Sequence, residues 1–275
     1  MAEKKTATKS AKVQHTFTAA DGSGSTTQKP PVNATAAKPA EGKAGAGKYR
    51  LFAILLWIVG IACEVIAILL ITNKIGWQPQ LLWLIVFLVV DLGCVIAGSQ
   101  LWKKSNRLDP ASEKNKVKFW LWNNLGVIMS VLAFVPFIII ALTNKDTDKK
   151  TKTIAVVVAI VALLIGGVSS YDFNPISAEQ KESMEAEYEG ATVYWTKSGT
   201  VYHLDPDCSH LNHSEELMYG DVDQAIEANK TRVCKDCERR AAEATEPADD
   251  EKTIDGETGE TEAETEEAVG FEING

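Results

Sequence analysis

Apolar side chains are concentrated in four long runs in the middle of the chain. These runs cover residues 51–71, 81–101, 120–142 and 154–170. A helix needs roughly 20 apolar residues to cross a bilayer, because the hydrocarbon offers no water to satisfy open backbone groups. The pattern therefore predicts a mainly α bundle of about four transmembrane helices, in a membrane region at residues 49–171, embedded in a lipid bilayer.

Two acidic residues interrupt this apolar pattern. Glu64 is the only charged residue of the first run, and Asp91 is the only one of the second. Ionisable groups inside a membrane are costly and usually face a partner or a wet cavity. One interpretation is a proton or ion site of a transporter or ion-conducting protein, assisted by Asn123 and Asn124. The interpretation we favour is a pair of protonated carboxyl groups, because the apolar spans contain no basic partner.

Lysine and arginine residues between the runs bear on orientation. The loop after the second run is rich in them, and the first loop carries only Lys74. The positive-inside rule places the second loop and the N-terminal segment in the cytoplasm, and four passes return the C-terminal part to that side. The lysines before the fourth run favour the opposite side. We expect a multi-pass cell-membrane protein with a cytoplasmic C-terminal part, the compartment that suits reduced thiols.

The two ends of the chain are polar and oppositely charged. Residues 1–48 are basic and rich in Ala, Lys, Thr, Gly and Pro, whereas residues 241–275 are acidic, with Lys252 as the only cation. Both segments have too little apolar surface to offset the entropy of ordering, so disorder is predicted for both. No apolar core falls within roughly the first 30 residues, so the run at Leu51 is expected to be a retained helix rather than a secretory signal.

The segment after the fourth run mixes polar and apolar residues, as a water-soluble domain does. Ser177 followed by Gln180 matches a capping box, which predicts a linker helix within residues 172–190. Residues 192–196 and 200–204 are β-rich and flank a turn, which predicts a hairpin. Asp221 can cap a further helix. Residues 191–240 are therefore predicted to form a small α+β domain.

Potential metal ligands gather in this domain. Three of the five cysteines and three of the four histidines fall between residues 203 and 237. Zinc prefers four sulfur or nitrogen ligands in a tetrahedron. The predicted ligands are Cys208, Cys234 and Cys237, with His203, His210 or His213 as the fourth. The apolar core of a domain this small contributes too little stability by itself, and a structural metal would add to it.

Two other chemistries fit the same cysteines less well. A redox pair at Cys234 and Cys237 would need a βαβ context, which the surrounding sequence does not show. Cys208 as a nucleophile would need a lowered pKa and an oriented base, and no further motif supplies them. We therefore predict no catalytic residues.

Residues 191–238 resemble the metal-binding domain of the Ada DNA-repair protein, and resemble more closely the Ada-like modules of bacterial membrane proteins and nucleases. The matching segments are Val193-Tyr194-Trp195-Thr196, Val201-Tyr202-His203, Asp207-Cys208 and Cys234-Lys235-Asp236-Cys237. The resemblance implies that His203, Cys208, Cys234 and Cys237 stand at the four zinc-ligand positions. Two departures are the histidine at the first position and a first spacing that is one residue longer. Zinc binding should survive both, whereas methyl transfer from DNA should not.

The sequence thus predicts a membrane-anchored zinc-binding module that is structural or recruits an unknown protein partner. Nucleic acid is an alternative partner, because phosphate binding needs clustered cations. A basic run beside the Cys-x-x-Cys segment comprises Lys230, Arg232, Lys235, Arg239 and Arg240.

Overall fold

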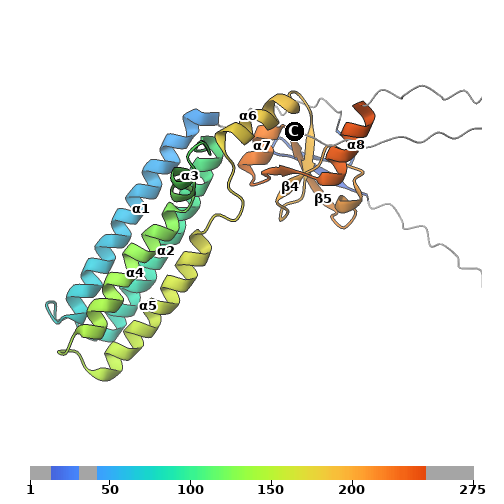
Figure 1. Cartoon of the computed structure of the whole chain (residues 1–275). Coiled ribbons are helices and arrows are strands. Elements are labelled where there is room, and N and C mark those ends of the chain that lie inside the picture. The colour runs from blue at the N-terminus through green and yellow to red at the C-terminus, as the bar shows by residue number, and fades with distance from the viewer. Residues whose placement is uncertain (1–13, 31–41, 246–275) are drawn as a thin grey trace, which may run out of the picture.

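The computed structural model describes residues 14–30 and 42–245. A bundle of long helices carries a smaller region with a β-sheet at one end (Figure 1). Four helices are long and apolar enough to cross a membrane: α1 (Gly42–Ile71), α2 (Gln80–Leu108), α4 (Leu125–Thr143) and α5 (Lys149–Ser170). The prediction of four helices able to span a membrane is confirmed.

The helices pack through small and large apolar residues and expose others outward. Leu70, Leu88, Phe134 and Ala159 come from the four different helices and are fully buried in one core. The outer surface carries a belt of exposed apolar side chains, including Ile58, Val89, Ile139 and Leu164. A belt of this kind would be unfavourable in water, whereas lipid is a suitable solvent for it.

The third predicted span begins later than the sequence indicated. Instead of one helix over residues 120–142, a short helix α3 (Lys116–Asn123) is separated from α4 at Asn124, whose φ is −105° and ψ is 17°. The side-chain amides of Asn123 and Asn124 donate to the carbonyls of Phe119 and Trp120, at 3.0 Å each. Such local bonds compete with the helical backbone ladder, which explains why the apolar run is divided here.

The sheet region combines two sheets with short helices. The main sheet has the strand order β2-β1-β5-β3, and a second sheet pairs β4 with β6 in parallel. The strands are β1 (Thr16–Ala19), β2 (Ser25–Thr26), β3 (Val193–Trp195), β4 (Val201–Tyr202), β5 (Glu216–Gly220) and β6 (Arg232–Val233). The predicted hairpin is present as a bridge, in which Tyr194 and His203 exchange backbone hydrogen bonds of 2.8 and 2.7 Å.

The N-terminal segment contributes the central strand β1 and the first residues of α1, so the prediction of disorder over residues 1–48 is wrong for residues 14–30 and 42–48. Phe17 lies opposite Leu217 in a parallel pair with β5. Phe17 and Ala19 are buried, while Thr18 between them is partly exposed, which is the alternation of a strand with one face on a core. Residues 1–13, 31–41 and 246–275, to which the remaining predictions of disorder apply, lie outside the described residues.

Three helices complete the sheet region: α6 (Ala178–Glu187), α7 (Val222–Glu227) and α8 (Lys235–Thr245), with a 3-10 turn at Ser209–Leu211. The predicted caps are present. The side chain of Ser177 accepts a hydrogen bond from the backbone amide of Gln180, and that of Asp221 accepts one from the backbone amide of Gln224. Helix α8 extends to Thr245, so residues 241–245 of the predicted acidic tail are helical. Helix α6 is the predicted linker helix, and its Met184 packs against the core around Trp195.

Lys181 of α6 joins the helix bundle to the sheet region. Its ammonium group lies 2.9 Å from Asp223 at α7 and 3.3 Å from Glu185. It also donates to the carbonyl of Leu108, the last residue of α2, at 3.4 Å. The side chain is only 8% exposed, so one buried cation satisfies groups on both parts of the molecule.

Candidate metal centre

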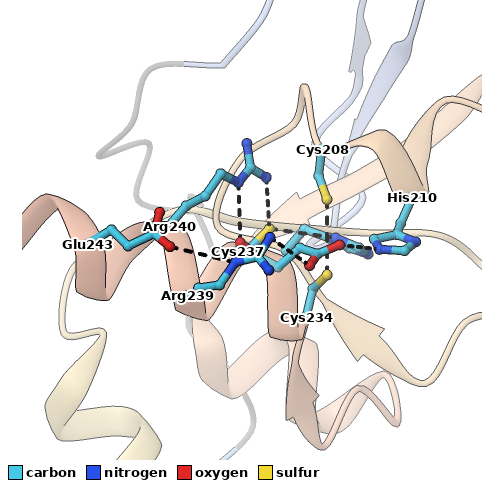
Figure 2. Close-up of polar contacts among 9 residues, drawn as sticks. Cys208, His210, Cys234, Cys237, Arg239, Arg240 and Glu243 are labelled. Atoms are coloured by element: carbon cyan, nitrogen blue, oxygen red, sulfur yellow. Dashed lines mark hydrogen bonds and ion pairs between the residues drawn. The ribbon is translucent and has the colours of Figure 1, made fainter.

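Four buried side chains converge from separate segments of the sheet region. His203 follows β4, Cys208 precedes the 3-10 turn, Cys234 follows β6, and Cys237 lies in the first turn of α8. Their ligand atoms all lie within 4.8 Å of one another, and each residue is less than a tenth exposed. Figure 2 shows the three sulfur atoms of the cysteines facing a common point.

The distances within this cluster match those between the ligands of one tetrahedral ion. The sulfur atoms of Cys208 and Cys234 are 4.0 Å apart, and Cys237 Sγ is 3.8 Å from Nδ1 of His203. Sulfur ligands about 2.3 Å from a tetrahedral zinc would be separated by about 3.8 Å. Disulfide-bonded sulfurs lie about 2.05 Å apart, so these are free thiols at metal-ligand spacing.

Backbone pairing explains why residues distant in sequence meet here. The amide of Cys234 donates to the carbonyl of Tyr202 at 2.8 Å, which sets Cys234 beside His203 through the β4–β6 pair. The carbonyl of Asp205 accepts from the Cys208 amide at 3.2 Å, which turns the chain back toward the cluster. The carbonyl of Cys234 accepts from Glu238 of α8, so the two ends of the Cys-x-x-Cys segment are held by one helical turn.

Burial favours the neutral forms of the ligands in the protein alone. Loss of hydration, together with the neighbouring Cys237 and Cys234, raises the pKa of the Cys208 thiol to about 12. The same loss of hydration, with the nearby His210 and Arg240, lowers the pKa of His203 to about 4. A divalent cation would compensate the thiolate charge and release protons on binding. The cluster could therefore hold a metal ion.

Arg240 stands beside the cluster and was not singled out by the sequence as part of it. It donates to Cys237 Sγ at 3.7 Å and to the carbonyl of Asp236, and it pairs with Asp205 at 3.0 Å (Figure 2). Three thiolates, one imidazole and a divalent cation carry a net charge of −1, which this guanidinium offsets. The sequence signal was its position three residues after Cys237, one turn along α8.

The two alternative fourth ligands lie away from the cluster. His210 Nε2 contacts Asp236 Oδ2 at 2.7 Å, and its side chain is 59% exposed (Figure 2). His213 is exposed as well. Of the three histidines predicted as candidates, the structure brings only His203 together with the cysteines.

The intramembrane acids Glu64 and Asp91 are both buried. Asp91 packs against Gly60, where an added Cβ would lie 2.6 Å from Oδ1 of the carboxyl group. Asn123, predicted as an assisting group, instead accepts from Asn106. Asn106 lies 15 residues beyond Asp91, which is about 22 Å along α2. The structure therefore places Asn123 away from Asp91, rather than beside it in one ion site.

The basic run is dispersed rather than assembled into one surface. Lys230 is 2% exposed and donates to the carbonyls of Lys197 and Gly199. Arg239 pairs with Asp236 and Glu243. Only Arg232 and Lys235 of the run are exposed without a carboxylate partner among the described residues, which is little charge for binding a nucleic-acid backbone.

Comparison of the chain with protein families, with curated proteins and with solved structures yields no match. The buried cluster and the four apolar helices are therefore the features that bear on function.

Proposed function

We propose that this chain is a membrane-anchored zinc-binding module in which His203, Cys208, Cys234 and Cys237 hold one ion. The observation that carries the proposal is the convergence of three thiol sulfurs and one imidazole nitrogen in a buried cluster. Soft thiolates combined with imidazole in tetrahedral spacing favour zinc over harder cations. Because the protein supplies all four positions, a structural site fits better than a catalytic one, which would keep a position open.

The resemblance to the Ada-type metal-binding domain supports the same ligand set. It assigns the four positions to the residues that converge, including the histidine at the first position. Imidazole cannot accept a methyl group as a thiolate would, so methyl transfer is not part of the proposal. We propose a role in structure or in recruiting a protein partner.

We further propose that the module faces the cytoplasm. The sheet region lies at the end of the bundle where α1 begins (Figure 1), and this end carries more lysine and arginine residues than the opposite end. Its cations are Lys48, Arg50, Lys103, Lys104, Arg107, Lys114, Lys116 and Lys118. Those of the opposite end are Lys74, Lys145, Lys149, Lys150 and Lys152. The positive-inside rule favours the cytoplasm for the first set.

The test is the metal content of the full chain, purified in detergent without added zinc. The full chain is needed because the core of the sheet region includes Phe17 from the N-terminal segment. We expect about one zinc per chain, lost in Cys208→Ser and His203→Ala because each removes a ligand. The matched controls Cys94→Ser and His210→Ala should retain it. A metal-free wild-type chain that is folded, or equal loss in the controls, would contradict the proposal.

A further inference from the structure

A pocket of about 390 Å³ lies at the end of the bundle that carries the sheet region. It is formed where the start of the apolar part of α1, the segment after α2, and α3 meet. Its walls include Arg50, Asp109, Ser112, Lys114, Lys118 and Trp122. None of these residues belongs to the metal centre.

The surrounding surface places this pocket at the depth of lipid headgroups. On α1, the exposed apolar belt begins with Leu51, directly after Arg50. On α3, Val117, Trp120 and Leu121 are exposed at the spacing of one helical face. An apolar stripe with tryptophan, flanked by lysines, is typical of a helix that lies in the membrane interface. The pocket therefore opens where phosphate groups of a bilayer would be found.

The charge in the pocket is unbalanced. Arg50 pairs with Asp109 at 3.0 Å and lies over the ring of Trp122 at 5.5 Å, so one cation is already neutralised. Lys114 and Lys118 have no ion pair within 4.0 Å among the described residues. Glu179 interacts with Lys114 at longer range, but its carboxylate accepts from Ser112 and from the Glu113 amide. Lys118 is therefore left without a compensating anion, and Lys114 has only the more distant carboxylate of Glu179.

We propose that this pocket binds the phosphate of an anionic phospholipid headgroup. Lysine ammonium groups bind phosphate as point charges, and the fixed guanidinium of Arg50 adds further positive potential. The apolar surface that begins at Leu51 and on α3 gives the acyl chains a continuous path, which free phosphate would not need. The inference depends on the proposed membrane setting but not on zinc binding.

The full chain is reconstituted in vesicles of phosphatidylcholine mixed with phosphatidylglycerol and then extracted in mild detergent. Native mass spectrometry compares how much of each lipid the protein retains. We expect selective retention of phosphatidylglycerol. The double variant Lys114→Gln/Lys118→Gln should weaken it about 30-fold, since each lysine near an anionic surface contributes roughly fivefold. The matched control Lys149→Gln/Lys150→Gln removes the same charge at the opposite end of the bundle and should bind as wild type.

Each other outcome overturns the inference. Equal loss in the two double variants would show non-specific attraction to anionic lipid, and no loss in either would exclude the pocket. Displacement of the lipid by millimolar inorganic phosphate would identify a site for free phosphate instead. Zinc content and membrane association are measured on the same samples. Normal zinc content and membrane association without lipid selectivity would contradict the lipid site and leave the proposed function standing.

Discussion

Burial of His203 links the folding of the metal-free sheet region to pH. The imidazole is 4% exposed, and loss of hydration lowers its pKa to about 4, against an ordinary value of about 6.5. Between these values the unfolded chain binds a proton that the folded chain does not. Stability should therefore be complete above about pH 6.5 and fall as the pH decreases toward 4.

The measurement is denaturant unfolding of the chelator-treated chain at a series of pH values. The metal-free protein should lose up to about 3 kcal/mol of stability between neutral pH and pH 4 through this residue. His213→Ala should show the same decrease, because that side chain is exposed and does not contribute to the shift at His203. A flat profile across this interval would show that His203 ionises freely in the folded state.

Ligand spacing alone does not choose the fourth ligand, and at the level of sequence only the resemblance to the Ada-type domain favours His203. His203, His210 and His213 all lie near Cys208, and linear spacing does not say which ring turns inward. The structure distinguishes them through tertiary contacts. The β4–β6 pair directs His203 to Cys237, whereas Asp236 draws His210 away from the cluster. The three cysteines and their common site, by contrast, were evident from composition and spacing.

At the scale of elements, strand β1 should stabilise the metal centre from a distance. Phe17 is 5% exposed in the same apolar cluster as Cys208, Cys234 and Cys237, and its ring meets that of Tyr194 edge-on at 6.0 Å. Phe17→Ala would open a cavity beside the ligands and should cost about 3–5 kcal/mol. We expect zinc to be lost to a chelator much faster in this variant.

The control for this variant is Phe173→Ala, which removes an equally large ring that is 69% exposed. It should lose zinc at the wild-type rate. The readout is release of zinc to a coloured chelator under native conditions. Equal rates for Phe17→Ala and the wild type would show that β1 does not support the centre.

The elements differ in how well local sequence predicts them. A membrane helix satisfies its own backbone and needs only a long apolar run, so the helices that match 51–71 and 154–170 followed from composition. Strand β1 has four residues, and its partner β5 lies about 200 positions later. Such a pairing leaves no local signal beyond the alternation at Phe17 and Ala19. The break at Asn124 was missed because the apolar run continues across it.

At the scale of the whole molecule, Lys181 should control how firmly the sheet region is attached to the bundle. Lys181→Met keeps the length of the side chain but leaves Asp223 and the Leu108 carbonyl without their cation. Removing one partner of a buried charged contact costs roughly 1–3 kcal/mol, which corresponds to about 5- to 150-fold in local opening. Amide hydrogen exchange in α6 should accelerate accordingly.

Lys197→Met is the matched control, because that lysine is exposed on a turn of the sheet region. Its exchange in α6 should equal that of the wild type, and both variants should retain zinc. If exchange in α6 is unchanged by Lys181→Met, the attachment depends on the other contacts of α6, such as those of Met184.

The pairing of β1 with β5 also constrains how the chain is threaded through a bilayer. β1 precedes the first apolar helix and β5 follows the last, yet their backbones are hydrogen-bonded. Paired strands lie about 4.8 Å apart, and the hydrocarbon is roughly 30 Å thick. If the four helices cross a bilayer, both flanks must share one compartment, and the number of crossings is even. During synthesis β1 is made first and has no partner strand until β5 is made. The β1–β5 pair can therefore form only after the last helix has been inserted.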